Sequence, residues 1–79
     1  MSKRDKLLRR MRENPRGIRP SEVDSLLLHY GFEKRRSGRN HCVYSRGPYV
    51  ITVNFHREYV HSKAIKEILS ILDELLEGE

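Results

Sequence analysis

Four histidines are the only side chains in this sequence that titrate near neutral pH without a special environment. His29 falls in the last turn of an expected helix, where a cation suits the helix dipole, and we interpret it as structural. His61 precedes Ser62, an expected helix cap, and we interpret it as a polar loop residue. His56 directly follows an expected strand, beside Arg57, where loops often present functional groups. Functional and structural roles for His56 are equally open.

His41 has the most informative surroundings. It directly follows Gly38, Arg39 and Asn40. Glycine permits a tight turn and the close approach of a ligand, and arginine can hold a phosphodiester. An imidazole at that phosphate could remove a proton from a ribose 2′-hydroxyl or protonate the leaving 5′-oxygen, with no metal, while arginines stabilise the phosphorane. The residues alone slightly favour a simpler role, in which His41 only binds phosphate or begins a strand.

Basic residues around His41 form a cluster that could hold an RNA backbone: Lys34, Arg35, Arg36, Arg39 and Arg46. The whole chain of 79 residues has a net charge of +5, and its final segment is acidic. A polarised charge map with an excess of arginine favours a polyanion partner over a merely solvated basic surface. Tyr44, Tyr49 and Tyr59 are available to stack on bases. Tyr44 and Tyr49 are better explained as core or sheet residues.

Other chemistries find less support in the sequence. The single cysteine, Cys42, excludes an internal disulfide and a paired-cysteine zinc site. Neighbouring strand residues point to opposite faces, so a catalytic pair of Cys42 and His41 is not expected. Most acids lie on the last expected helix in the pattern of a solvated face, which does not suit a metal-dependent nuclease. With no membrane-length apolar run and no cleavable leader, we expect a cytoplasmic protein without metal, cofactor or membrane contact.

The elements that must position these residues can be read from periodicity. We expect a basic helix over residues 3–13, a breaker at 14–17, and a second helix that is capped by Ser21 and closed by Gly31. Strands are expected at 32–37, 41–45 and 49–55, and a final helix capped by Ser62 runs to residue 77. The order predicts an α+β fold, a double-stranded-RNA-binding-like αβββα domain with a three-stranded antiparallel sheet and an extra N-terminal helix. Residues 1–20 are expected as a basic N-terminal extension and 21–77 as the core of a single domain.

Three segments resemble the HicA family of toxin endoribonucleases. They are Leu26–Glu33 (LLLHYGFE), Gly38–Tyr44 (GRNHCVY) and Val50–Arg57 (VITVNFHR). The similarity extends over about residues 21 to 75 and keeps the same order of elements. It implies a double-stranded-RNA-binding-like fold and metal-independent cleavage of mRNA, as the toxin of a type II toxin–antitoxin system. It also implies a HicB-like antitoxin as partner, for which an acidic surface is expected.

The resemblance places the family's catalytic histidine at His41, with Gly38 as the motif glycine, and this tips the preference towards catalysis. Asn40 stands where a serine is usual, and Asn54 where a proline is common. The remaining expected RNA contacts are Lys34, Arg35, Arg36, Gly38, Arg39, Asn40, Arg46, His56 and Arg57. Two alternatives stay open. One is a non-catalytic RNA-binding module of the same fold, and the other is an interaction protein whose basic face docks an acidic protein.

Overall fold

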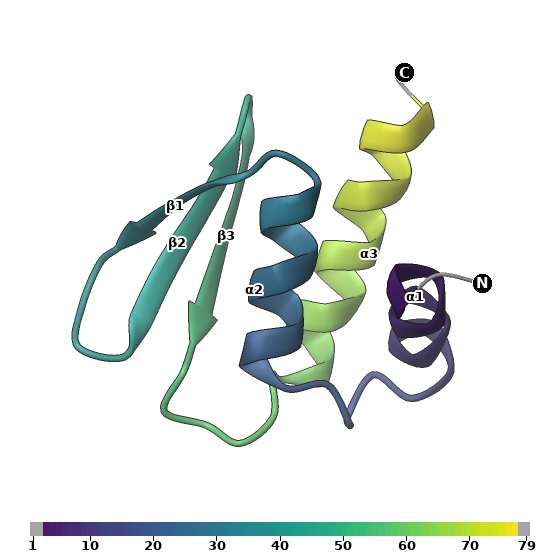
Figure 1. The fold of residues 1–79 in the computed structure, drawn as a ribbon, viewed down its shortest axis with the longest axis horizontal. Helices are drawn as coiled ribbons and strands as arrows, with labels where there is room; N and C mark the ends of the chain where they lie inside the picture. Colours follow the sequence, from purple (N-terminus) through teal and green to yellow (C-terminus); the bar gives the residue numbers. More distant parts are fainter. Residues whose placement is uncertain (1–2, 78–79) are drawn as a thin grey trace.

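The computed structural model describes residues 3–77 of the chain. Its helices and strands follow in the order α1 (Lys3–Glu13), α2 (Pro20–His29), β1 (Glu33–Arg36), β2 (His41–Arg46), β3 (Tyr49–Asn54) and α3 (Ser62–Glu77), as Figure 1 shows. The expected α+β class and the expected element order are confirmed. Each predicted strand begins and ends within one residue of the observed one. Alternating burial marks β2 and β3, whereas all four residues of β1 are exposed.

The strands form an antiparallel meander in the order β1-β2-β3. Arg46 pairs with Tyr49 across the turn between β2 and β3, so Gly47 and Pro48 alone connect these strands. Gly47 has a φ of 58°, in the left-handed region that favours glycine, as the first position of a two-residue hairpin often requires. This short connection fixes the register of β2 against β3.

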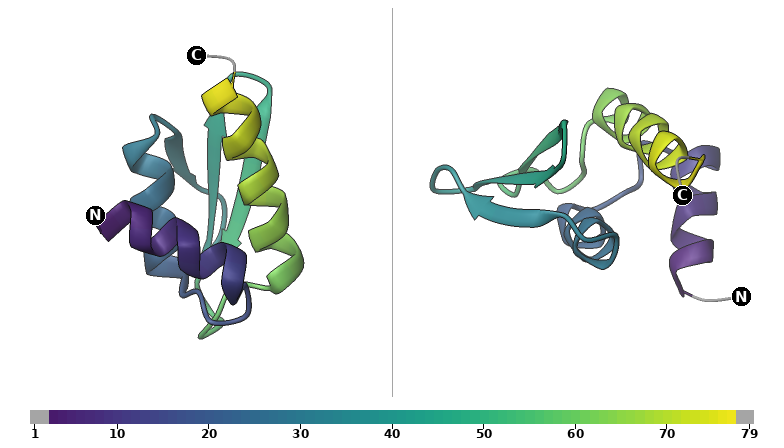
Figure 2. Two further views of the ribbon diagram at one scale, coloured as in Figure 1. Left: turned by 90° about the vertical axis from the view of Figure 1, so that its right-hand side faces the viewer. Right: turned by 90° about the horizontal axis from the view of Figure 1, so that it is seen from above.

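The protein is layered. Helices α2 and α3 cover one face of the sheet, and α1 lies on their far side, as Figure 2 shows. In β3, Ile51 and Val53 are buried beneath the helices, whereas Val50 and Thr52 face outward from an uncovered sheet face. None of the helices within residues 3–77 is long and apolar enough to cross a membrane.

The first helix contributes directly to the core. Met11 and Ile18, in and just after α1, are fully buried in the same apolar cluster as the side chains of α2, α3 and the sheet. At the surface, Arg12 forms an ion pair with Asp73 of α3 at 2.6 Å. The stretch expected as an N-terminal extension is therefore packed into the same core as the rest of the described chain.

The start of α2 differs from the prediction. Ser21 was expected to cap this helix, but the helix begins at Pro20, and Arg19 occupies the capping position without a side-chain cap bond. Instead, the Glu22 carboxylate accepts a hydrogen bond from the Arg19 backbone N–H at 3.1 Å. Proline suits the first helical position, because it lacks an N–H and its φ is already helical. Pro20 thus moves the boundary ahead of Ser21.

The cap of α3 was also wrongly predicted. Ser62 lies inside the helix, and His61 precedes it. The His61 Nδ1 atom accepts a hydrogen bond from the backbone N–H of Lys63 at 3.1 Å. His61 is therefore the N-terminal cap of α3, and one of the free amide groups of the first turn is satisfied by an imidazole.

Candidate nucleic-acid interface

The antiparallel register brings the residues around His41 to one end of the sheet. His41, the first residue of β2, pairs with Asn54, the last residue of β3. On its other side β2 pairs with β1, where Cys42 lies opposite Arg36. The β1–β2 connection, the start of β2 and the exit from β3 are therefore neighbours in space.

Backbone hydrogen bonds hold this end of the sheet together. The Ser37 N–H donates to the His41 carbonyl at 3.1 Å, which closes the connection between β1 and β2. The Phe55 N–H donates to the Asn40 carbonyl at 2.6 Å, which joins that connection to the chain leaving β3. The positions of Asn40 and His41 are thus set by both neighbouring strands.

A small open cavity of about 170 Å³ lies at this end. His41 is exposed at this cavity. The other lining residues are Lys34, Arg36, Arg39, Asn40, Cys42 and Phe55. Six of the seven lining positions come from the segment 34–42 that sequence reasoning singled out. The structure therefore brings together five of the predicted site residues, namely Lys34, Arg36, Arg39, Asn40 and His41.

Gly38 lies in the connection between β1 and β2, three residues before His41. Within residues 3–77 the glycines with positive φ are Gly31 and Gly47, so the conformation of Gly38 does not demand glycine. A Cβ atom at Gly38 would lie 3.7 Å from Nδ1 of His41, an ordinary van der Waals distance. The chain bends at residues 38–40, as expected, but the backbone of Gly38 is one that alanine could also adopt. Gly38 nevertheless lies directly beside the imidazole of His41.

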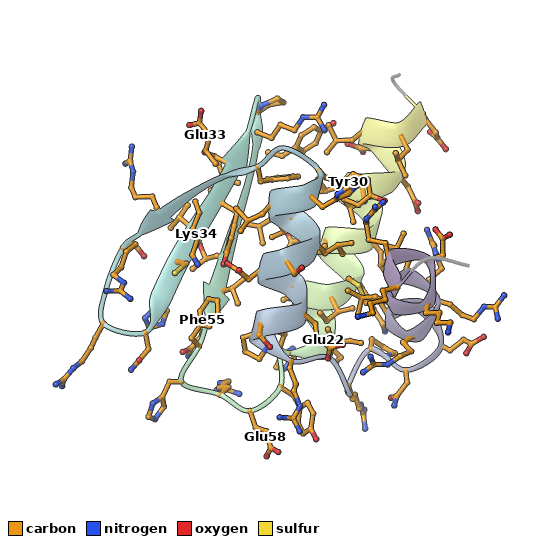
Figure 3. All side chains as sticks on the ribbon, viewed as in Figure 1. Glu22, Tyr30, Glu33, Lys34, Phe55 and Glu58 are labelled. Atoms are coloured by element: carbon orange, nitrogen blue, oxygen red, sulfur yellow. The ribbon has the colours of Figure 1, made fainter. Side chains whose placement is uncertain are left out.

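Lys34 is held at the cavity by an ion pair. Its Nζ lies 2.8 Å from the Asp24 carboxylate of α2 and 5.7 Å from the centre of the Phe55 ring. Figure 3 marks Lys34 and Phe55 at the sheet. The hydroxyl of the fully buried Tyr44 donates to the same Asp24 oxygen. Lys34 therefore bridges α2 and the sheet, and its charge is matched by a carboxylate instead of being fully available to a phosphate.

The protonation states of this trio follow from its contacts. Burial raises the pKa of Asp24, but hydrogen bonds from Lys34 and Tyr44 outweigh it, and the pKa lies below its ordinary value. Burial and the hydrogen bond to Asp24 raise the pKa of Tyr44. The hydrogen bond to Asp24 also raises the pKa of Lys34. At neutral pH the trio is an ionised acid between a neutral phenol and an ammonium group.

Asp24 was missed as a structural residue by the sequence analysis. A signal was present, because Asp24 lies beside the core positions Val23 and Leu27 on α2, where a solvated acid is not expected. The partner could not be named from sequence, because Tyr44 lies twenty residues further along the chain.

Two of the predicted RNA-binding residues lie away from His41. The half-buried Arg46 donates to the Tyr30 carbonyl at 2.8 Å, at the opposite end of β2. Arg35 pairs with Val43 and is exposed on the uncovered face of the sheet. The predicted basic cluster is thus divided between both ends and both faces of the sheet.

His56 and Arg57 lie in the loop after β3, at the same end as His41, but outside the cavity lining. Both are exposed. The backbone N–H of His56 donates to the Asn54 side-chain carbonyl at 2.9 Å, so Asn54 organises the first turn of this loop. His56 is therefore fixed by its backbone near the exit from β3.

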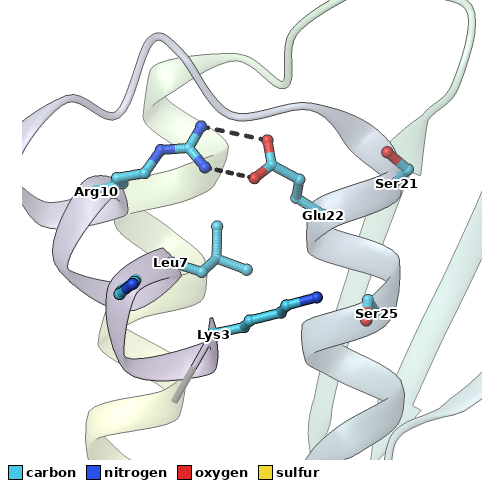
Figure 4. A pocket seen from close by; sticks show the side chains of 7 residues that line it. Lys3, Leu7, Arg10, Ser21, Glu22 and Ser25 are labelled. Atoms are coloured by element: carbon cyan, nitrogen blue, oxygen red, sulfur yellow. Dashed lines mark hydrogen bonds and ion pairs between the residues drawn. The ribbon is translucent and has the colours of Figure 1, made fainter. Parts of the chain in front are cut away.

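A larger cavity, of about 490 Å³, lies between α1 and α2. Figure 4 shows Lys3 and Leu7 from α1 opposite Ser25 from α2, with the Arg10 guanidinium donating to both oxygens of Glu22. Burial raises the pKa of Glu22, but the bonds from Arg10 and from the Arg19 backbone more than offset it and lower that pKa. No histidine lines this cavity, so His41 has no counterpart there.

The His41 cavity combines what phosphate chemistry needs at a solvent-open site. Guanidinium groups of Arg36 and Arg39 can bind a phosphodiester, and an imidazole such as that of His41 can accept or donate a proton in catalysis. Among the described residues, no group of three or more His, Cys, Asp or Glu side chains is placed to hold a metal ion. Comparisons with protein-family models, curated proteins and solved structures gave no significant match.

Proposed function

We propose that this chain is an endoribonuclease of the HicA type, with a double-stranded-RNA-binding-like fold, that cleaves mRNA at His41. One observation carries the proposal. His41 lines an exposed cavity together with Arg36, Arg39 and Asn40, so an imidazole and phosphate-binding groups face the same space. The element order and the covering of one sheet face by α2 and α3 agree with such a fold.

In the proposed reaction, His41 takes the proton of a ribose 2′-hydroxyl at the bound phosphate. The 2′-oxygen forms a bond to phosphorus, the bond from phosphorus to the 5′-oxygen breaks, and that oxygen receives a proton. Arg36 and Arg39 stabilise the charge that develops on the phosphate oxygens. The second proton-transfer group is water or His56. The products are a 2′,3′-cyclic phosphate and a free 5′-hydroxyl.

The proposed biological role is that of the toxin in a type II toxin–antitoxin pair, with mRNA as substrate and a HicB-like protein as inhibitor. The exposed, cationic cavity supports an acidic inhibitor, because a carboxylate-rich surface would occupy the phosphate positions and desolvate the same arginines. Such an inhibitor would cover His41 directly.

The test is incubation of the purified protein with a labelled mRNA in excess EDTA, beside His41→Gln and the matched control His29→Gln. His29 is exposed on α2 and contacts the Tyr30 ring, so its loss leaves the cavity unchanged. Cleavage should fall by about 10²–10⁴-fold in His41→Gln and persist in His29→Gln. The new ends should carry cyclic phosphate, and a 2′-deoxy substitution at the cut should block the reaction. Equal cleavage by both variants, after confirmation that both are folded, would refute the role of His41.

A non-catalytic RNA-binding module is the second candidate, and one observation favours it. The cavity lining contains one imidazole and no carboxylate, so His41 has no second imidazole and no carboxylate beside it in the lining to act as a partner acid or base. In that case the same assay leaves the RNA intact with every variant, while the RNA remains bound and the binding weakens steeply with salt.

A further inference from the structure

Three loops that are distant in the sequence lie side by side at one end of the molecule. They are the loops 14–19, 37–40 and 55–61; in Figure 1 the first and the last lie at the bottom of the view and the loop 37–40 at its lower left. The Phe55 N–H donates to the Asn40 carbonyl at 2.6 Å, and the Val60 N–H donates to the Ile18 carbonyl at 2.8 Å. The loop 55–61, which we call the middle loop, is therefore joined by backbone hydrogen bonds to the loop 37–40 on one side and to the loop 14–19 on the other.

This end of the molecule is strongly basic. The three loops carry four arginines, Arg16, Arg19, Arg39 and Arg57, against one acid, Glu58, and all four arginines are exposed. Glu58 lies at the tip of the middle loop in Figure 3. In the sequence, Arg16 and Arg19 belong to the basic N-terminal extension that was expected over residues 1–20. The fold instead places them on the same edge as His41.

A second cavity lies further along this edge. It has a volume of about 370 Å³ and is lined by Arg16, Val60, His61 and Ser62. Ser62 begins α3, so this cavity adjoins the positive end of a helix and receives the Arg16 side chain as well. The middle loop thus runs from the His41 cavity at Phe55 to this second cationic cavity at Val60.

Between the two cavities the middle loop exposes an aromatic ring. The Tyr59 side chain is 42 % exposed, and the Arg19 guanidinium lies 5.8 Å from its ring centre. Cationic grooves interleaved with exposed aromatic rings are the usual means of binding single-stranded nucleic acid, because every unpaired base has a face that can stack.

We infer that this basic loop edge, formed by Arg16, Arg19, Arg39, Arg57 and Tyr59, binds a single RNA strand that runs past His41. The inference rests on the proposed function only for what happens at His41. The bound RNA is inferred to be unpaired for two reasons. A base can stack on Tyr59 only when it has left a duplex, and attack by a 2′-hydroxyl requires an in-line geometry that an A-form helix does not allow.

The experiment measures binding of the full chain by fluorescence anisotropy. The probes are labelled 2′-O-methyl oligouridines of increasing length, which cannot be cleaved through a 2′-hydroxyl, and a blunt RNA duplex. Affinity should rise with length and level off once the edge is filled, within roughly 4–16 nucleotides. The duplex should bind more weakly than the longest single strand.

The paired variants are Arg16→Gln/Arg19→Gln on the edge and Arg4→Gln/Arg9→Gln on α1, which remove the same charge. The edge variant should bind the longest strand at least about tenfold more weakly, the effect of one lost charge-assisted hydrogen bond. For the edge variant, the slope of log affinity against log salt concentration should become shallower by about 0.7 for each lost phosphate contact. The α1 variant should match the wild type. A further pair, Tyr59→Leu and Tyr59→Phe, should show about fivefold weakening or more in the leucine variant alone.

Circular dichroism and thermal unfolding of each variant confirm that it is folded. Equal weakening by both arginine pairs would overturn the inference, because it would indicate general attraction by net charge. Preference for the duplex would overturn it as well, as would binding only to an acidic protein. Failure of the proposed function would be seen separately, as mRNA that stays intact in the cleavage assay. That result would not change the expected length dependence of binding or the expected weakening in the edge variants.

Discussion

Replacing Asp24 by alanine tests the contact that ties α2 to the sheet beside the His41 cavity. Tyr44 is fully buried, and its hydroxyl donates to the Asp24 carboxylate, which also pairs with Lys34 at 2.8 Å. The Cys42 side chain is a second hydrogen-bond partner of Tyr44, but a thiol is a much weaker acceptor than a carboxylate. The substitution therefore takes the carboxylate acceptor away from a buried hydroxyl, whereas the ammonium group of Lys34 returns to water.

The expected loss in the free energy of unfolding comes from the buried Tyr44 hydroxyl and not from Lys34, whose ammonium group can be hydrated. An unsatisfied buried polar group costs about 1–3 kcal/mol, which for a domain of this size lowers the melting temperature by roughly 5–15 °C. Tyr44→Phe removes the donor but leaves Asp24 paired with Lys34, so its cost should be only about 0.5–1.5 kcal/mol. Asp24→Asn keeps an acceptor for the hydroxyl and should be milder than alanine.

Urea unfolding of the wild type, the single variants and Asp24→Ala/Tyr44→Phe gives the coupling energy. The double variant should lose clearly less stability than the sum of the two single losses, because phenylalanine no longer needs an acceptor. Additive losses, or an Asp24→Ala variant within about 0.5 kcal/mol of the wild type, would show that the buried hydroxyl does not depend on this carboxylate.

The same contact predicts a pH dependence. The pKa of Asp24 is lowered in the folded protein, against an unfolded value of about 3.9. The stability that its ionised form contributes is therefore present above the unfolded pKa and is lost as the pH falls through the lower folded pKa. The stability difference between the wild type and Asp24→Asn should be constant from about pH 6 to 8 and should shrink below about pH 4. A difference that stayed constant down to pH 2 would contradict the assignment.

Two further substitutions test how the helices are built. Met11→Ala should lower the free energy of unfolding, measured in urea titrations, by about 2–5 kcal/mol, because the Met11 side chain is fully buried where α1 packs on the core. A loss below about 1 kcal/mol would show that α1 is not integral to the fold. His61→Ala should cost about 0.5–2 kcal/mol through loss of the cap on Lys63, whereas His61→Asn should retain most of the stability; equal melting temperatures for wild type and both variants would contradict a capping role.

The sequence by itself determined the elements and their apolar faces. In the sequence, Ile51 and Val53 alternate along β3 and Ile65, Ile68 and Leu72 recur at helical spacing along α3, and these are the faces that the structure buries. These features depend on periods of 2 and 3.6 residues, which any fold must respect. The helix caps were less predictable. Pro20 starts α2 one residue before Ser21, and His61 caps α3 in place of the expected Ser62, so the general preference for serine as a cap was misleading at both helices.

The candidate site was predictable only where it is local in the chain. Arg36, Arg39, Asn40 and His41 share one short connection, so a sequence pattern could bring them together. The strand register decided the rest, because alternate residues point to opposite faces and the two ends of β2 lie far apart. For that reason Arg46 is separated from His41, although only four residues lie between them in the chain.

Only the tertiary structure decided what lies beside His41. The pairing of Lys34 with Asp24 and the gathering of Arg16, Arg19 and Arg57 on one edge join residues that are far apart in the sequence. Such contacts depend on how whole elements pack, and no local preference of a residue encodes its distant neighbour. The sequence therefore determined which charges the protein carries, and packing decided which of them are matched and which face the solvent at the same place.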